Sequence, residues 1–466
     1  MIDLASQHDS APSGYNKSHR FPIWIALAIA VAMVGIYHEQ RDVGEGEGDY
    51  VLATDRVVEQ DSSDGRVQVG NLQEKVSFAA LLLIGAYLAF VTRPERGWRP
   101  NRLAWVVAVC FGWAALSFFW STEPSITLRE LIRLSAVALV AFGIARNYTA
   151  NQAMFIALVV CSASVLTALA SELAAGCLTP WIYGYRLRGG MHANMVALHA
   201  AIMAIAAVGC LRVSKRTSVL CLLIAIALAA LLLTKSRSGA ATFLVGVTML
   251  WSLRLDPRRM AAFWSSLVTV SAVVVLALAI GGSQWQRSFG GAAAMGRNDD
   301  VGSLTGRLPL WNLLTDYIQQ RPLQGFGYEA FWTGKRRLDV GDEVVWYPTD
   351  AHSIYINTML ELGLIGTLLL STMAITALVV LTKAYRETAC TGYAFFATLV
   401  GIAFFHGLAE VGCSAPRIAG LCIGSGVFVA TGWRSTVDQP VRQAAREQEV
   451  ASRSDHSADL LLGGSP

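Results

Sequence analysis

The feature that most constrains the fold of this chain is a series of apolar segments, each close to the length of a membrane-spanning helix. A helix needs roughly 20 apolar residues to cross the hydrocarbon core of a bilayer. Some segments are shorter, so the expected number of spanning helices is twelve, give or take one. The segments cover residues 22–37, 76–92, 103–120, 131–145, 153–175, 191–211, 219–234, 238–253, 261–281, 362–382, 390–411 and 418–433. The sequence therefore predicts an all-α polytopic integral membrane protein whose membrane domain occupies residues 22–433.

The composition excludes two broad classes of protein. Charged residues make up 15% of the chain and hydrophobic residues 54%, whereas soluble domains carry about 25% charged residues. Too few charges remain to solvate the surface of a soluble enzyme. The chain has 37 Lys and Arg against 33 Asp and Glu, and a nucleic-acid-binding protein would concentrate its basic residues in a solvated patch. Membrane lipids are therefore expected partners, and nucleic acid is not.

Basic residues lie in every second connection between the apolar segments, and this alternation predicts the orientation of the chain. Cytoplasmic connections keep Lys and Arg, whereas short translocated ones lose them. The basic connections contain Arg93, Arg96, Arg99 and Arg102, then Arg212, Lys215 and Arg216, then Arg254, Arg258 and Arg259, and finally Lys383 and Arg386. With an even number of spans, residues 1–21 and 434–466 are then both cytoplasmic tails, and the second is expected to be disordered. Residues 22–37 lack a following cleavage site and are expected to be a retained signal anchor.

The longest connection, residues 282–352, falls on the outer, periplasmic side in this orientation. It contains four tryptophans and is too patterned for a flexible linker. Within it, helical spacing relates the apolar residues Leu308, Trp311, Leu314, Tyr317 and Ile318. An Arg-Pro pair at 321–322 would end such a helix. The pattern predicts an amphipathic helix on or near the outer membrane face.

Five cations fall on the outer side, at or near the ends of apolar segments, against the usual charge bias. They are Arg186, Arg188, Lys235, Arg237 and Arg307. Guanidinium groups donate paired hydrogen bonds to phosphate oxygens, and several converging cations can offset a doubly charged group. The pattern indicates a site for an anion, most strongly at Arg237 in its tight turn. The alternative is that these side chains extend to lipid headgroups.

His352 is the candidate general base, since it lies where the long outer connection meets the membrane. An imidazole can take up a proton near neutral pH. The alternative is an interfacial histidine with no chemical role. Two further pairs of polar residues could each share a helix face, either as a proton relay or in packing: His192 with His199, and His406 with Glu410.

The remaining polar candidates do not indicate a metal or ATP site. Carboxylates occur in the long connection at Asp299, Asp300, Asp339 and Asp342, but such loops are usually just solvated. A glycine-rich phosphate-binding loop is absent from the sequence. Cys177 and Cys413 fall in outer connections, where a disulfide is chemically allowed.

Two strings in the second half of the chain carry recognisable motifs, TGRLPLWNLLTDYIQQRPLQGFGYEAF at 305–331 and DAHSIYINTMLELGLIG at 350–366. Together they resemble the core of the bacterial O-antigen ligase and O-antigen polymerase family. The usual motifs are Gly-Arg-x-x-x-Trp, Pro-x-x-Gly-x-Gly, His-x-x-Tyr and Glu-x-Gly-x-x-Gly. The matching residues, in order, are Arg307, Trp311, Pro322, Gly325, Gly327, His352, Tyr355, Glu361, Gly363 and Gly366. Weaker matches at 120–133, 186–200 and 235–243 extend the resemblance over most of residues 105–370.

The resemblance implies a membrane-embedded glycosyltransferase of the GT-C type that uses a polyprenyl-diphosphate-linked glycan as donor, with no metal and no cofactor. It also implies that Arg237 and Arg307 bind the diphosphate and that His352 activates the acceptor hydroxyl. The chemistry of the residues fits these roles, because cations stabilise the leaving diphosphate and a base opposite to it assists a single inverting displacement. One departure is His192-Ala193-Asn194, where many members have Pro before the Asn.

The expected function is glycan transfer at the periplasmic face of a bacterial inner membrane. The WSTEPSITLRELIR segment at 120–133 resembles exopolysaccharide polymerases and favours a polymerase, whose acceptor is a second lipid-linked glycan, over a ligase, whose acceptor is lipid A core. The alternative from another class is a secondary transporter or a flippase for lipid-linked glycans. Such a protein would show two related halves with interrupted helices near mid-membrane, whereas the unusual charges here gather at one face.

Overall fold

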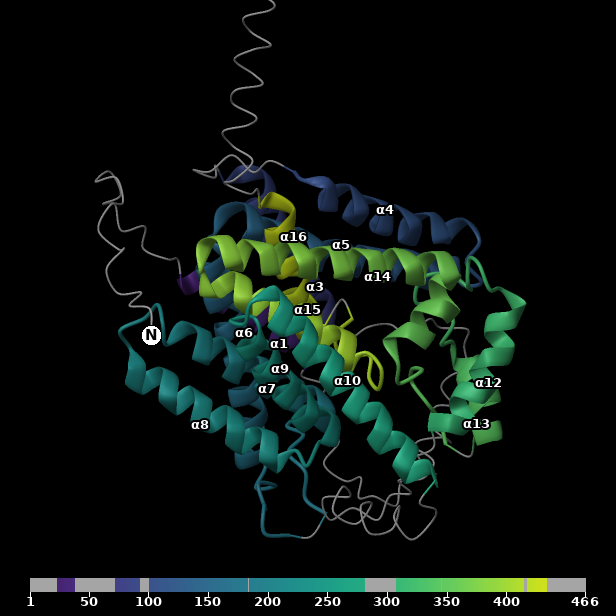
Figure 1. Cartoon of the computed structure of the whole chain (residues 1–466). Coiled ribbons are helices and arrows are strands. Elements are labelled where there is room, and N and C mark those ends of the chain that lie inside the picture. The colour runs from purple at the N-terminus through teal and green to yellow at the C-terminus, as the bar shows by residue number, and fades with distance from the viewer. Residues whose placement is uncertain are drawn as a thin grey trace, which may run out of the picture.

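The computed structural model describes residues 23–37, 72–92, 100–182, 184–280, 307–344, 346–414 and 417–433, and the regular secondary structure in these ranges is entirely helical (Figure 1). The membrane-domain helices are α1 (Ile23–Tyr37), α3 (Leu72–Ala86) with a π-helical end (Tyr87–Val91), α4 (Arg102–Leu116) with a 3₁₀ turn (Ser117–Phe119), α5 (Pro124–Asn147), α6 (Ala150–Ala174), α7 (Ala193–Cys210), α8 (Thr217–Leu233), α9 (Arg237–Ser252), α10 (Pro257–Ile280), α14 (Ile354–Thr388), α15 (Thr391–His406) and α16 (Ile418–Gly432). The outer connection adds α12 (Arg307–Gln320) and α13 (Gly334–Val344).

Each of the twelve predicted apolar segments overlaps a helix, which confirms the all-α class. Within the described ranges, five helical stretches are long and apolar enough to cross a membrane: Leu72–Val91, Arg102–Phe119, Ala150–Ala174, Ala193–Cys210 and Ile354–Thr388. The chain is therefore a multi-pass membrane protein. The number of twelve spans and the GT-C type stay predictions, and the two predicted tails lie outside the described residues.

Helix α7 forms the centre of the membrane domain. Most of its residues are buried, and it packs against α6, α8, α9 and α15. Its sequence is rich in alanine, and small residues let neighbouring helix backbones approach closely in a membrane. The start of α7 is therefore held firmly among the neighbouring helices.

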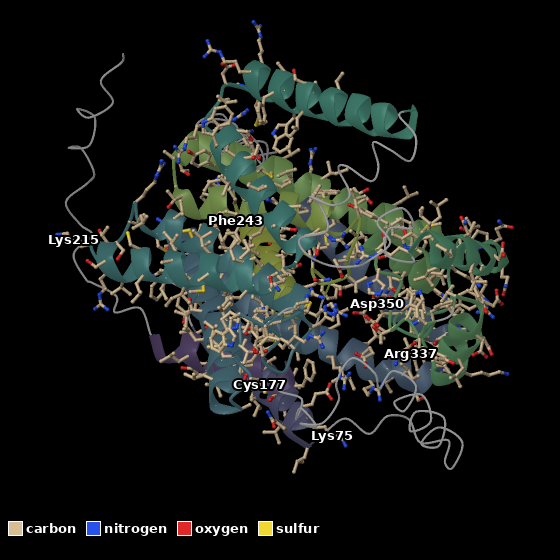
Figure 2. The ribbon with its side chains drawn as sticks, turned by 90° about the horizontal axis from the view of Figure 1, so that it is seen from below. Lys75, Cys177, Lys215, Phe243, Arg337 and Asp350 are labelled. Atoms are coloured by element: carbon tan, nitrogen blue, oxygen red, sulfur yellow. The ribbon has the colours of Figure 1, made fainter. Side chains whose placement is uncertain are left out.

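The described connections that are predicted to be outward meet at one end of the helices. Side-chain and backbone hydrogen bonds join 117–123 to 326–330, 184–192 to Thr234, and the start of α14 to Gly407. The opposite end joins Asn101 to Ala430 and Asn151 to Gly392. Figure 2 shows Asp350 of the first end far across the molecule from Lys215. The compartment that each end faces stays a prediction.

Helix α12 confirms the predicted amphipathic helix, with one correction. Leu310 and Leu314 are fully buried against a cluster that includes Phe331 and Leu360, whereas Leu308 is 43% exposed. The predicted apolar series included Leu308 and left out Leu310, whereas Leu310 is the residue that is buried in this cluster. Residues 310 and 314 are one turn apart and face the first turns of α14, and this position fixes α12 and α13 beside the end of that helix (Figure 1).

Candidate functional site

The glycine-rich turn of the outer connection is bound into a break in α14. Gly363 has φ +66° and ψ −168°, which interrupts the helix. The backbone N–H groups of Phe326 and Gly327 donate to the carbonyls of Leu360 and Glu361, both at 2.8 Å, and a matching bond at 2.8 Å runs from the N–H of Leu364 to the carbonyl of Pro322. We call residues 322–327 and 360–365 the loop–helix junction. It satisfies backbone groups that the break in the helix leaves open.

The α4–α5 connection is attached to the same junction. The N–H of Thr122 donates to the carbonyl of Phe326 at 2.9 Å, and the indole Nε1 of Trp120 donates to the carbonyl of Gln324 at 3.0 Å. The hydroxyl of Thr127 donates to the carbonyl of Tyr328 at 3.0 Å. The WSTEPS segment and the two glycine motifs therefore have a shared structural role, which is to fix the outer connection on the first turns of α14.

His352 lies just before α14 in a constrained backbone conformation. Its φ is +47°, in the left-handed region that non-glycine residues rarely occupy. Its backbone N–H donates to Oδ1 of Asp350 at 2.8 Å. Two residues later, the backbone N–H of Ile354 donates to the carbonyl of Gly407 at 2.8 Å. Such conformations cost about 1–3 kcal/mol and gather at functional sites. The surrounding contacts thus hold His352 in one position.

The imidazole of His352 faces two carboxylates and one aromatic ring. Its Nδ1 lies 3.6 Å from Oδ1 of Asp350 and 3.8 Å from Oε2 of Glu410. This nitrogen is enclosed and has no hydrogen-bond partner among the described residues. The ring of Trp346 lies with its centroid 5.5 Å from that of His352 and is tilted by 37°.

Glu410, in the connection after α15, joins His352 to the cations. Its Oε1 accepts a hydrogen bond from Nη2 of Arg307 at 2.8 Å and another from Nδ2 of Asn194 at 2.7 Å. Arg307 also donates through Nη1 to the carbonyl of Ala409. Burial raises the pKa of Glu410, but the interactions with His352 and Arg307 outweigh burial and lower it to about 2. Glu410 is therefore a carboxylate throughout the physiological range.

Asn194, at the start of α7, extends the connections to a second arginine. Its Oδ1 accepts from Nη2 of Arg186 at 3.1 Å and from the hydroxyl of Ser236 at 2.9 Å. Nε of Arg186 donates to the carbonyl of Thr234 at 3.0 Å. We call His352, Glu410, Arg307, Asn194, Arg186 and Ser236 the polar network. It links four separate parts of the chain at one end of the helices.

The other predicted cations lie beside this network. Ser236 caps α9 by accepting from the N–H of Gly239 at 3.1 Å, and it is flanked by Lys235, with φ +46°, and by Arg237, the first residue of the helix. Arg188 is exposed, and its side chain is not part of the polar network. The structure thus brings Arg186, Arg307 and His352 together, places Lys235 and Arg237 next to them, and leaves Arg188 at the edge.

In neither of the two predicted polar pairs, His192 with His199 and His406 with Glu410, do the side chains hydrogen-bond to each other. Nδ1 of His192 accepts from the N–H of Asn194 at 3.3 Å and so caps α7, and burial lowers the pKa of this imidazole. His199 is hydrogen-bonded to Ser164 at 2.8 Å, and His406 to Thr242 at 3.0 Å. Each histidine therefore has a different partner, supplied by its own backbone or by a neighbouring helix.

A buried glutamate that the sequence did not single out holds the arginine-bearing loop before α7. Glu172, near the end of α6, is 1% exposed. Its carboxylate accepts from the hydroxyl of Tyr185 at 2.6 Å and from the backbone N–H groups of Arg188 and Gly189 at 2.8 and 2.9 Å. A carboxylate near the outer end of an apolar helix is the signal that could have identified it.

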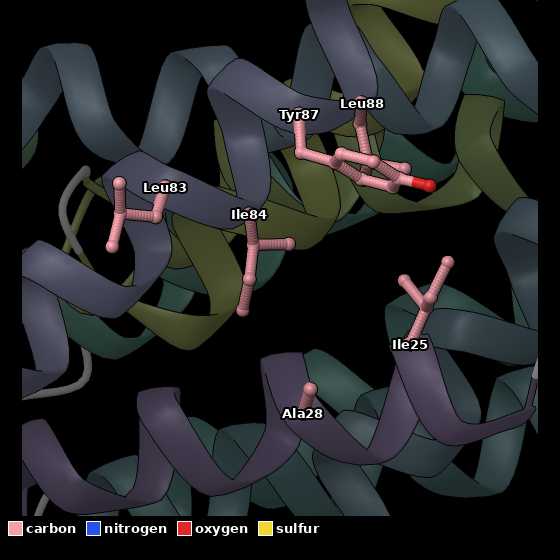
Figure 3. Close-up of a pocket in the computed structure, with 6 residues that line it drawn as sticks. All are labelled: Ile25, Ala28, Leu83, Ile84, Tyr87 and Leu88. Carbon is pink, nitrogen blue, oxygen red and sulfur yellow. The ribbon is translucent and has the colours of Figure 1, made fainter. Parts of the chain in front are cut away.

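The remaining candidates in the described part of the chain are a metal site, a disulfide and a cavity. Among them, no group of three or more His, Cys, Asp or Glu is placed to hold a metal ion; Asp299 and Asp300 lie outside the described residues, and Asp342 accepts from the hydroxyl of Tyr347 at 3.1 Å. Cys177 and Cys413 are both free. A cavity of about 240 Å³ between α1 and α3 is apolar (Figure 3). It is lined by Ile25, Ala28, Leu83, Ile84, Tyr87 and Leu88.

Comparison with known proteins identifies one domain. Residues 222–371 match the family model described as O-antigen ligase. A search of curated proteins found no match. The matched range contains Lys235, Arg237, Arg307 and His352, together with the loop–helix junction, but it ends before Glu410. Over residues 222–371 the chain is therefore similar to the O-antigen ligase family, which confirms the resemblance to the O-antigen ligase and polymerase family.

Proposed function

We propose that the chain is a membrane glycosyltransferase that transfers a glycan from a polyprenyl-diphosphate donor to a sugar hydroxyl at the periplasmic face of a bacterial inner membrane. The observation that carries this proposal is the polar network, which joins the candidate base His352 to two arginines through Glu410 and Asn194. The O-antigen ligase domain that contains His352 and Arg307 supports the same reaction class.

The cations serve the leaving group. Breaking the bond between the anomeric carbon and the diphosphate oxygen leaves negative charge on the diphosphate, and preplaced donors stabilise that charge as it develops. Arg307 is fixed by Glu410 and the carbonyl of Ala409, and Arg186 by Asn194 and the carbonyl of Thr234. Lys235, Arg237 and the exposed Arg188 add charge nearby, so positive charge exceeds that of Glu410. The diphosphate would meet side chains that are already oriented.

His352 serves the acceptor. With Nδ1 turned towards the carboxylates of Asp350 and Glu410, Nε2 is the nitrogen left to accept the hydroxyl proton. Because Glu410 stays ionised, it stabilises the imidazolium that forms, as a carboxylate does beside a catalytic histidine. Attack by the hydroxyl opposite the diphosphate would invert the anomeric centre in one step. No metal or other cofactor is needed for these steps.

The sequence favours one class of acceptor. The resemblance of residues 120–133 to exopolysaccharide polymerases favours a second lipid-linked glycan as acceptor over lipid A core.

The rival function is that of a transporter or flippase, in which an interrupted helix should expose its backbone to substrate or ions. The break in α14 is instead filled by the backbone of residues 322–327, which favours the enzyme.

The test is an assay of the purified chain in detergent with polyprenyl-diphosphate-linked glycan, with and without lipid A core. Longer lipid-linked glycan identifies a polymerase, and glycan attached to the core identifies a ligase. Activity is expected to persist in EDTA, since side-chain cations carry the electrostatic role. Absence of both products with intact donor would overturn the proposed glycan transfer. Loss of activity in EDTA that magnesium restores would overturn the metal-independent mechanism.

A further inference from the structure

We infer that Trp346 and Asp350, which both lie beside the His352 ring, form the subsite for the acceptor sugar. This inference rests on the proposed function and assigns the part of the site that the cations do not explain. Two sets of residues lie around His352. One is Glu410 with its bound Arg307, and the other is Trp346 with Asp350. The first group suits a diphosphate, so the second is left for the incoming sugar.

Trp346 carries a polar atom that no described residue satisfies. Its indole Nε1 is enclosed and has no hydrogen-bond partner within the described part of the chain. In the same cluster, Nε1 of Trp311 donates to the carbonyl of Ala351 at 2.8 Å, and Nε1 of Trp332 donates to Oδ1 of Asn357 at 2.7 Å. An enclosed donor without an acceptor costs about 1–3 kcal/mol. A ligand hydroxyl beside His352 would remove this cost.

The chemistry of Trp346 and Asp350 suits a sugar. The apolar C–H face of a sugar ring packs on an aromatic ring, and sugar hydroxyls both donate and accept hydrogen bonds. Trp346 offers a ring and a donor, and Asp350 offers a carboxylate. Oδ1 of Asp350 already accepts from the N–H of His352, and Oδ2 lies 3.8 Å from Nη2 of Arg417. The carboxylate is thus held in place and keeps lone pairs for a hydroxyl.

The position of the subsite also suits the reaction. Inversion requires the acceptor hydroxyl and the diphosphate to lie on opposite sides of the anomeric carbon. A sugar held by Trp346 would present its hydroxyl to His352, while the donor diphosphate lies with Arg307 and Arg186. Both proposed acceptors, a lipid-linked glycan and lipid A core, present such a sugar, so the subsite alone does not choose between them.

The test compares Trp346→Phe, Trp346→Ala and the control Tyr347→Phe in the transfer assay. Phe keeps the ring and loses the N–H, so the KM for acceptor should rise roughly two- to tenfold, the equivalent of one hydrogen bond. Ala loses both and should raise it further. The KM for donor should stay unchanged in all variants. Tyr347 is exposed and its hydroxyl bonds Asp342, so its variant should behave as wild type.

A second readout separates this inference from the proposed function. Binding of soluble acceptor glycan, without donor, is measured by calorimetry on wild type and both Trp346 variants, with either acceptor class. Weaker acceptor binding in the variants supports the subsite, whether or not the wild-type protein transfers glycan. A wild-type protein that binds acceptor but transfers no glycan would overturn only the proposed function. Unchanged acceptor binding and unchanged acceptor KM in Trp346→Phe and Trp346→Ala would overturn the subsite, as would an equal rise in donor KM.

Discussion

At the scale of single residues, Arg307 illustrates why charge alone does not define the site. Two nitrogens of its guanidinium are already engaged, Nη1 with the carbonyl of Ala409 and Nη2 with Glu410. Both bonds point the planar group in one direction and leave further N–H donors for a phosphate. A lysine has a single nitrogen and cannot hold this orientation while it also binds a ligand.

Arg307→Lys is therefore expected to lower turnover by roughly 10²–10³-fold, the effect of removing one well-placed donor from a transition state. Turnover should be measured on purified protein with expression matched to wild type. Arg254→Lys is the control, because Arg254 is exposed at the opposite end of the helices. Near-normal turnover of Arg307→Lys would remove Arg307 from the diphosphate site.

Glu329, beside the loop–helix junction, gives a prediction for pH dependence. Burial raises the pKa of its carboxyl from 4.5 to about 7, and the Glu130 carboxylate adds to this effect. Folding therefore favours the protonated form, so the contribution to stability is present below pH 4.5 and is lost as the pH rises through 7. Glu329→Gln copies the neutral form at every pH.

The thermal unfolding midpoint of Glu329→Gln should match that of wild type at pH 4 and exceed it at pH 8 by roughly 2–4 °C, the shift that about 1 kcal/mol produces in a large domain. The exposed Glu343→Gln should show no such difference. A wild-type advantage at pH 8 would contradict the assignment.

At the scale of elements, the loop–helix junction depends on glycine at positions where another residue cannot fit. Gly363 has φ +66°, and a Cβ there would collide with the carbonyl group of Leu323. Gly363→Ala is expected to lower the free energy of unfolding by roughly 1–3 kcal/mol, measured by thermal or denaturant unfolding in detergent. Gly112→Ala is the matched control, since nothing lies within 4 Å of an added Cβ in α4. Equal stability of the two variants would rule out the strained junction.

The sequence predicted the elements better than their contacts. Apolar length located the membrane helices, and helical spacing located α12, because both are local properties of the chain. The spacing could not tell that Leu310 rather than Leu308 is buried, since that depends on which face meets α14. The bond between Asn194 and Glu410 joins residues 216 positions apart. No local pattern encodes such a pair, so the sequence identified the cations and Glu410 but not the bonds that connect them.

At the scale of the whole molecule, the two ends of the helices are chemically different. One carries the polar network, and the other carries the basic connections, which predicts that the network end is periplasmic. Two natural cysteines test this orientation: Cys177 lies in the loop after α6, at the network end, and Cys390 lies between α14 and α15, where its thiol contacts Asn151.

Variants that retain only Cys177 or only Cys390 should therefore differ in labelling by a membrane-impermeant maleimide. Cys177 should react in cells whose outer membrane alone is permeable, and Cys390 only after the inner membrane is disrupted. The reverse pattern would place the polar network in the cytoplasm and exclude a periplasmic reaction.

The most direct test of the central claim is glycan transfer by His352→Gln, measured together with donor binding. Gln keeps a polar group but cannot take up a proton, so transfer should fall by roughly 10²–10⁴-fold. Donor affinity should stay near that of wild type, because Arg307 and Arg186 are held by Glu410 and Asn194. A variant that transfers normally, or that fails only because donor no longer binds, would contradict the account.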